Sequence, residues 1–314
     1  LKAGEMTLFP QEDGTFRARG EKHYVGNASK ASFVSTFGRI HGTGECVFFA
    51  VKADQPGFEC VQRIDTSGMR QAQVMHYRLN DYPITPELIL SRGSLAWECA
   101  LNTVNVGKFG MGFASIGICT HALYEALSHA SGRILYARPV TDFPYVRALL
   151  TEAVARLSAM KLCGLRAADY LRCASEDDRR NLLFNQILKM RVTSQGVAVI
   201  GLLHELIAAK GFEQGTYFEM ALRDIGMLPK LDGCEQANLA LIIRFMDGYF
   251  FARQDYPETP RRNDPADDAG LFRQHTGGLS KIRFPDYRKC YEGANIPNLL
   301  VFREQLELFK DLLI

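Results

Sequence analysis

Short runs of alternating apolar and polar residues, separated by turn residues, occupy residues 1–95 of the chain. β-branched and aromatic residues dominate these runs, and the turns QEDGT, HGTGE, QPGF and TSGM lie between them. Both features are typical of half-buried strands in an antiparallel arrangement. The sequence therefore predicts an antiparallel β-barrel or sandwich whose strands are TFRARGEKHYVG, SFVSTFGRI, CVFFAVKA, FECVQRI and QVMHYRLN.

Beyond this region the apolar residues recur with a helical period. The Gly- and Ala-rich segment 107–130 and the segment 146–171 predict two long helices. A third helix is predicted to follow SEDD at 175–178, and a fourth to begin at Asp232 and end near Ala252. Four long helices with short connections predict an antiparallel four-helix bundle.

These patterns divide the chain into three predicted parts. Residues 1–95 form a β domain, residues 96–254 the helix bundle and residues 255–314 a C-terminal extension. In that extension YPETPRRNDPADDAG (256–270) is rich in Pro and charge and predicts a surface loop, while residues 296–314 predict an amphipathic helix. The predicted fold class is α+β.

Charge and hydropathy exclude two classes of partner. The formal net charge is only +2 and no block of like charge is present, so the basic surface expected of a nucleic-acid binder is missing. The longest apolar stretch, VAVIGLLHELIAA (197–209), contains His204 and Glu205 and is shorter than the roughly twenty residues that cross a bilayer. We therefore expect neither a nucleic-acid partner nor a membrane span.

The cysteines and the N-terminus bear on the compartment. Eight cysteines lie far apart, without a CxxC pair and mostly inside apolar segments. This spacing favours reduced core thiols over disulfides or zinc ligands, so the sequence predicts a reducing compartment such as the cytoplasm, and no metal site. The chain begins LKAGEMTLF, without an initiator Met or a signal-like segment, as expected of a fragment that lacks its true N-terminus.

Several passages carry a family resemblance. RDIGMLPKLDGCEQ (223–236) resembles, without a gap, the acyl-CoA dehydrogenase pattern Arg-Asp, seven residues, then Glu-Gly-Thr-x-Gln. AAKGF (208–212) stands where that family has Gly-Gly-x-Gly and an aromatic residue. GRILYARPVTDF (132–143), GEKHYVGNASKASFVSTFGR (20–39) and DYPITPELIL (81–90) are similar to further family passages, in family order. The resemblance implies the family's middle β domain and C-terminal helical domain, and it does not extend to the N-terminal helical domain.

The resemblance implies a base and a substrate contact. The family removes the proton next to a thioester carbonyl and passes a hydride to FAD, which needs a carboxylate in a dry site. Asp232 stands at the family's catalytic Glu, and its backbone N–H, at a helix start, would donate to the thioester oxygen. Lys108 occupies the position at which several family members have an active-site Arg. Because Asp is one methylene shorter than Glu, by about 1.5 Å, the change is expected to cost about a hundredfold in rate unless the backbone moves.

The resemblance also implies a set of FAD contacts. Arg133 would clamp the pyrophosphate of a neighbouring subunit's FAD, and Gln236 would supply an amide contact. Methyl groups at the two positions of the double glycine would hinder the approach of backbone to cofactor. The remaining positions are Tyr24, Val25 and Gly26 against the flavin ring, Glu205 in place of a Gln, and Ala208 and Ala209 in place of the glycines.

Local sequence offers Asp232 a simpler role. Asp232 followed by Glu235 approximates a capping box at the start of a helix, and a cap and a base are compatible in one residue. His204, on an apolar helical face, is interpreted as a core histidine with its hydrogen bonds satisfied.

Three functional hypotheses follow. The first is an acyl-CoA dehydrogenase-like flavoprotein of fatty acid metabolism, a homodimer or homotetramer that oxidises an acyl-CoA or other acyl thioester to the 2-enoyl thioester. It would pass electrons to an electron-transfer flavoprotein, in the cytoplasm or, in a eukaryote, in the mitochondrial matrix or peroxisome. The second is a nitroalkane-oxidase-like FAD-dependent oxidase of a small carbon acid, since those relatives use an Asp base. The third is a catalytically degenerate paralogue that acts as a partner subunit.

Overall fold

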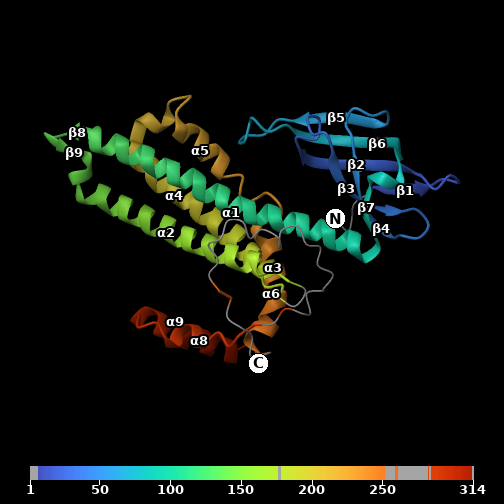
Figure 1. The fold of residues 1–314 in the computed structure, drawn as a ribbon. Helices are drawn as coiled ribbons and strands as arrows, with labels where there is room; N and C mark the ends of the chain where they lie inside the picture. The colour runs from blue at the N-terminus through green and yellow to red at the C-terminus, as the bar shows by residue number, and fades with distance from the viewer. Residues whose placement is uncertain (1–5, 176–177, 252–258, 261–281, 283, 313–314) are drawn as a thin grey trace.

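A seven-stranded sheet, a two-stranded hairpin and a set of long helices make up the described part of the chain. The strands of the large sheet lie together at one end, and the helices extend away from them (Figure 1). A computed structural model describes residues 6–175, 178–251, 259–260, 282 and 284–312. The strands of the sheet are β1 (Thr7–Pro10), β2 (Phe16–Gly26), β3 (Val34–Ile40), β4 (Cys46–Val51), β5 (Phe58–Ile64), β6 (Val74–Ile84) and β7 (Ile89–Arg92).

The sheet confirms the five predicted strands and differs in one pairing. Its hydrogen-bonding order is β5-β6-β2-β1-β3-β4-β7. The short strand β1 lies between β2 and β3, and its pairing with β3 is parallel whereas the other pairs of the sheet are antiparallel. The alternating pattern that predicted the strands buries one face, where Tyr77 is fully covered and shares a 2.7 Å hydrogen bond with the hydroxyl of Thr36.

The helical part begins directly after β7. A small hairpin, β8 (Ile134–Leu135) and β9 (Arg138–Pro139), joins the first two helices at the end farthest from the sheet (Figure 1). The helices are α1 (Gly93–Gly132), α2 (Pro144–Arg172), α3 (Asn181–Ile187), the π-helical turn η3 (Leu188–Val192), α4 (Thr193–Ile207), the 3₁₀ turn η4 (Ala208–Phe212), α5 (Tyr217–Ile225), α6 (Glu235–Phe250), α8 (Lys289–Glu292) and α9 (Pro297–Asp311).

Small side chains bring α1 close to its neighbours. Cys119, Ala122, Ala126 and Ala130 recur along one face of α1 and are fully buried against α2, α4 and α5. Helix α6 contributes no residue to this core and packs instead on α3, in a separate cluster around Phe245. The detail of four long antiparallel helices therefore stays a prediction, as does the division into domains at residues 95 and 254.

The continuous helical run through α3, η3 and α4 is unusually apolar. By length and composition alone, Asn181–Phe212 would suffice to cross a membrane. In the structure Val199, Ile200 and Leu203 lie in the core shared with α1 and α2. Burial inside the protein is what a central core helix requires, so the run gives no support to a membrane span.

Two further expectations are met in part. Helix α9 confirms the amphipathic helix predicted near the C-terminus, whereas the loop predicted at 256–270 lies almost entirely outside the described residues. The seven described cysteines are free thiols, but only Cys119 is fully buried, and Cys60 and Cys234 are exposed. The prediction that the cysteines are core thiols is therefore wrong for those two.

The sheet and the helices meet at two places. Trp97, in the first turn of α1, lies edge-on to Phe37 of the sheet with ring centroids 5.6 Å apart. On the other side the loop between β5 and β6 touches α5, where the backbone N–H of Met69 donates to Asp224 Oδ1 over 2.6 Å. A Cβ atom on the neighbouring Gly68 would lie 2.5 Å from the carbonyl oxygen of Arg223. The sheet and α5 can approach this closely only because residue 68 has no side chain.

We expect Gly68→Ala to loosen this junction. The added methyl group would meet backbone rather than a movable side chain, so the loop must shift, at a cost of about 1–3 kcal/mol. Thermal unfolding followed by circular dichroism should show a lower midpoint. Gly201→Ala is the matched control, because Gly201 on α4 faces open space and alanine favours a helix. Equal midpoints for the two variants would contradict the assignment.

Candidate functional site

Asp232 lies in the loop that connects α5 to α6 and is directed at α1. Its φ angle is +47°, in the left-handed region, and Gly233 follows at +98°. A Cβ atom on Gly107 would lie 2.9 Å from Asp232 Oδ2. The carboxylate therefore rests against the backbone of α1, in space that the missing side chain of Gly107 leaves free.

The structure contradicts the prediction that Asp232 begins a helix and caps it. Helix α6 begins at Glu235, its N-cap residue is Cys234, and no side chain caps it. Two consecutive residues with positive φ cannot continue into a right-handed helix, which is the physical reason for the difference. The backbone N–H of Asp232 makes no hydrogen bond with the described residues, so it can still donate to a ligand, although not from a helix start.

Two buried lysines flank the carboxylate. Lys108 comes from α1 and its ammonium donates to Oε1 of Gln186 on α3. Lys189, on the π-helical turn, is fully buried and donates to the carbonyl oxygens of Pro229 over 2.7 Å and of Gly233 over 2.5 Å. The two carbonyls lie on either side of Asp232 in the chain. Lys189 therefore holds both ends of the loop that carries the acid.

These charges and the partial burial set the protonation of the group. Burial raises the pKa of the Asp232 carboxyl above its ordinary value, although part of the residue meets solvent, and Lys108 and Lys189 oppose this increase. Desolvation, followed by the charge of Lys189, lowers the pKa of Lys108 to about 8, against the attraction of Asp232. Desolvation also lowers the pKa of Lys189. The result is an acid whose proton affinity depends on two nearby cations.

A cavity of about 240 Å³ adjoins Lys108. Half of its lining residues are apolar, and the other half are the polar residues Glu98, Asn102, Asn105, Lys108, Arg179 and Gln186. Asn105 is buried, and neither atom of its amide has a hydrogen-bond partner among the described residues. Unpaired buried amides are costly, so the part of the cavity beside Asn105 is suited to a polar ligand group. The apolar wall consists of Trp97, Leu101, Val104, Leu182, Leu241 and Phe245.

The residues predicted to face the flavin ring lie at the end of β2. Tyr24 has φ +58° and is 78% exposed, next to an irregularity in the pairing of β2 with β6. Val25 instead packs on the core of the sheet. A Cβ atom on Gly26 would meet nothing within 4 Å. Gln236 lies exposed in the first turn of α6. Tyr24, Gly26 and Gln236 are thus accessible to a ligand, and Val25 contributes packing.

The other predicted cofactor residues lie at the opposite end of α1. The helical rise places Arg133 about 37 Å from Lys108 along α1. Arg133 ends that helix, and the turn that contains Ala208 and Ala209 packs near the same end. Glu205 accepts a hydrogen bond from the hydroxyl of Tyr145. The structure therefore separates the predicted cofactor residues into two groups that a single ligand cannot bridge within one chain.

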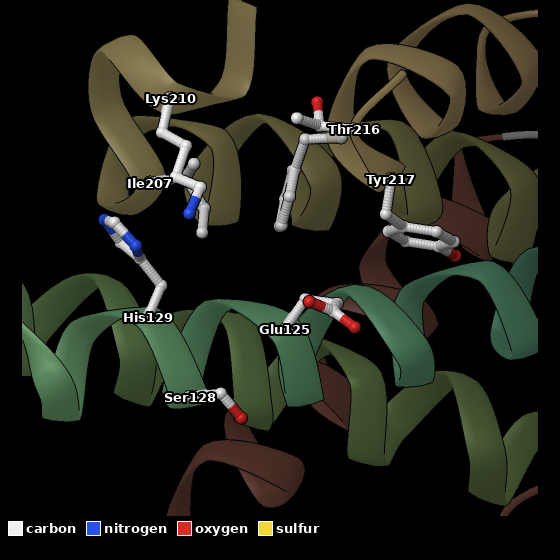
Figure 2. A pocket seen from close by; sticks show the side chains of 8 residues that line it. Glu125, Ser128, His129, Ile207, Lys210, Thr216 and Tyr217 are labelled. Carbon is white, nitrogen blue, oxygen red and sulfur yellow. The ribbon is translucent and has the colours of Figure 1, made fainter. Parts of the chain in front are cut away.

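A second cavity, of about 380 Å³, lies at this far end. Figure 2 shows His129 of α1 and Lys210 of η4 directed into it from opposite walls. Burial, Lys210 and Arg133 all lower the pKa of His129, and its Nε2 is buried without a hydrogen-bond partner among the described residues. The Nε2 of His204, close by, also has none, so the interpretation of His204 as a satisfied core histidine is wrong.

The sequence did not single out Lys189, Gln186 or Asn105. A lysine inside the apolar run LKMRV gave a signal, because a lysine is almost never fully buried unless it is paired. The partners of Lys189 are backbone carbonyls some forty residues away, and a carbonyl leaves no mark in a sequence. The roles of Gln186 and Asn105 likewise depend on which helices face each other.

Comparison with known proteins relates this arrangement to one family. The family described as "Acyl-CoA dehydrogenase, C-terminal domain" matches residues 97–246. Among curated proteins, a short-chain specific acyl-CoA dehydrogenase of Megasphaera elsdenii is 22% identical over 210 residues, which cover 63% of this chain and 54% of that protein. The chain spans about half the length of the curated relatives it matches.

Solved structures agree on the fold. Butyryl-CoA dehydrogenase from Megasphaera elsdenii superposes with a TM-score of 0.72 at 18% identity, covering 78% of this chain and 64% of that one. A flavoprotein nitroalkane oxidase superposes with a TM-score of 0.71 at 16% identity, covering 82% of this chain and 64% of that one. Both likenesses include the sheet as well as the helices, because each covers more of the chain than the helices alone.

We expect Lys189→Met to release the loop that carries Asp232. The variant loses two charge-assisted hydrogen bonds and leaves the carbonyl of Pro229 without this donor, while the carbonyl of Gly233 still accepts from Asn238 Nδ2, so the free energy of unfolding should fall by about 3 kcal/mol. Limited proteolysis should then cut near residues 229–233 in the variant and not in the parent protein. Lys230→Met is the matched control, since Lys230 is exposed and donates to a single carbonyl, that of Gly226. If both variants behave alike, Lys189 does not hold the loop.

Proposed function

Because the chain belongs to the acyl-CoA dehydrogenase family, we propose that it is part of an FAD-dependent oxidoreductase that oxidises an acyl thioester to the 2-enoyl thioester. Asp232 abstracts the proton next to the thioester carbonyl. One observation carries the proposal: the carboxylate that the sequence resemblance aligns with the family's base lies near two buried lysines, against the backbone of α1.

The surroundings of Asp232 suit a base. Proton abstraction needs the ionised form with a proton affinity above that of a free carboxyl, and partial burial supplies the higher affinity while the lysines keep the ionised form accessible. The free N–H of the same residue can donate to the thioester oxygen, where negative charge develops as the proton leaves. Lys189 holds the loop in place, which limits the rate loss that the shorter Asp side chain would otherwise cause.

The cavity beside Lys108 suits the substrate. Its apolar wall, around Leu101 and Phe245, matches an acyl chain or another apolar part of the thioester. The ammonium of Lys108 and the unpaired amide of Asn105 match polar or anionic groups of the ligand. A cavity with apolar residues and a cation complements the apolar chain and the polar or anionic groups of an acyl-CoA or a related acyl thioester.

The residues of this chain fit FAD in three respects. Ala137 and Ala208 keep positive φ angles of 61° and 58°, so the backbone still follows a path that glycine favours and an L side chain strains. Arg133 has no carboxylate partner among the described residues and is available to a phosphate. Gly26 faces open space. A bound FAD would supply the hydride acceptor for this reaction.

The distance along α1 supports assembly into an oligomer. Tyr24, Gly26 and Gln236 would contact one FAD near the sheet, whereas Arg133, with Glu205, Ala208 and Ala209, would contact the FAD of a neighbouring subunit. A homodimer or a homotetramer provides that neighbour. We further propose an electron-transfer flavoprotein as the partner that accepts the electrons, and a role in fatty acid metabolism in the cytoplasm or, in a eukaryote, in the mitochondrial matrix or peroxisome.

A second candidate is an FAD-dependent oxidase of a small carbon acid. It is favoured by the acid itself, which is Asp rather than the family's Glu, and by the likeness of the fold to a nitroalkane oxidase. The chemistry at Asp232 is the same in both candidates, because each removes a proton from an acidic carbon. They differ in the substrate that the cavity beside Lys108 accepts.

The first test is flavin binding and its reduction. The purified chain, reconstituted with FAD, should gain a visible flavin spectrum that butyryl-CoA bleaches without oxygen. Asp232→Asn should keep the flavin and lose turnover by at least a hundredfold, because the amide cannot accept the proton. Asp247→Asn, an exposed acid on α6, is the control and should leave turnover unchanged.

The alternatives predict different results in the same experiment. Bleaching by nitroethane and not by thioesters would favour the oxidase. A protein that takes up no FAD would exclude both enzymes and favour a degenerate partner subunit. Full turnover in Asp232→Asn would show that another residue is the base.

The pH dependence tests the role of Lys108 separately. The acid limb of kcat should lie above the ordinary range of an aspartate, because Asp232 must lose its proton to act and its pKa is raised. Lys108→Met removes a cation that favours the ionised carboxyl, so this limb should move to higher pH by about one unit. Lys161→Met, an exposed lysine of α2, should leave the profile in place. An unmoved limb in Lys108→Met would contradict the coupling.

A further inference from the structure

Two histidines and a glutamate gather on the outer face of the sheet, away from Asp232. Glu21 and His23 lie on β2, and His76 lies on β6. Residues two apart on a strand point to the same face, and an irregularity in the pairing between Lys22 and Val25 brings His23 beside His76. The two imidazole rings stack, with centroids 3.8 Å apart and planes inclined by 24°.

The polar atoms of these three residues converge on one point. Glu21 Oε2 lies 2.7 Å from His76 Nε2 and 3.9 Å from His23 Nε2. One ligand atom from each residue lies within 4.8 Å of the other two. In a tetrahedral site with metal–nitrogen distances near 2.0 Å, ligand atoms lie about 3.3 Å apart. Closing the three residues around one ion requires both imidazoles to rotate out of their stack, so that both Nε2 atoms face the ion, and Glu21 Oε2 to exchange its contact with His76 Nε2 for the ion.

The carboxylate is already oriented for this role. Arg78 contacts the other oxygen of Glu21, with Nη2 at 2.6 Å and Nε at 2.7 Å from Oε1. Because Oε1 is held by the guanidinium, Oε2 is left to face the histidines. An outer residue that orients a ligand is a regular part of protein metal sites.

The geometry points to a binding site for a divalent transition-metal ion, Zn²⁺ or a similar cation, formed by Glu21, His23 and His76. Two imidazoles and a carboxylate are ligands that such ions favour over Mg²⁺ or Ca²⁺. The side chain of His76 is 12% exposed, that of Glu21 31% and that of His23 57%. One side of the site is thus open, so a fourth position is left for water or an exchangeable ligand.

The sequence predicted no metal site, on the spacing of its cysteines. His23 and His76 are far apart in the chain, and only the register of β2 on β6 brings them together. The site shares no residue with the acid, the lysines or the cavities of the proposed oxidoreductase. The outcome of a zinc titration therefore does not depend on that function.

Zinc titration of the untagged, metal-free protein tests the site. Isothermal titration calorimetry should show one saturable Zn²⁺ per chain. His76→Ala and His23→Ala should each weaken binding more than tenfold, since each removes one of three ligands. His23 is largely exposed, so its variant tests the site even if His76→Ala does not fold. Circular dichroism shows whether each variant retains the fold.

The control is a second histidine and carboxylate pair. His121 lies 3.5 Å from Glu125 on the surface of α1, and this pair lacks a third ligand. His121→Ala should leave zinc binding unchanged. The proposal is overturned if the parent protein shows no saturable binding, if His23→Ala binds as tightly as the parent, or if His121→Ala accounts for the loss instead.

Discussion

A buried ammonium group must be paired, and the pairing of Lys189 determines the geometry of the candidate site. An unpaired charge at that depth would be far more costly than any single packing contact. Lys189 meets this requirement with the carbonyls of Pro229 and Gly233, and the loop between them is the one that carries Asp232. The π-helical turn at Leu188–Val192 supplies Lys189, and π turns in helices are frequent at functional sites. Fold stability and the position of the acid thus depend on the same contact.

The length of α1 explains how the chain is organised. A single helix of 40 residues carries Lys108 near the sheet and ends at Arg133, well beyond the reach of one ligand. Small residues along its buried face allow α4 to pack closely, so the two ends are rigidly related. A rigid separation of this kind suits a cofactor contact that one subunit provides for another.

Alanine occupies two positions whose backbone angles favour glycine. Ala208 and Ala137 adopt positive φ angles, which cost alanine about 1–3 kcal/mol each. Tyr24 and Asp232 are in the same region of φ. Strain persists only when the surrounding structure imposes it. Packing therefore maintains the path of the chain around the proposed cofactor and base, whatever residue occupies it.

The sequence by itself determined what depends on local periodicity. Alternation predicted β2 to β6, and helical spacing predicted α1, α2 and the run from α3 to α4, because side-chain chemistry and short-range backbone preference suffice for these features. The candidate acid, Asp232, was identified instead by the resemblance of residues 223–236 to a family pattern.

Tertiary structure alone decided the features that join distant segments. It placed the loop between Pro229 and Gly233 on Lys189 and brought His23 beside His76. Helix α6 begins at Glu235 and not at Asp232, where the sequence predicted its start. In each case the deciding feature is a backbone carbonyl, a left-handed φ angle or a strand register. None of these is encoded in the identity of a neighbouring residue.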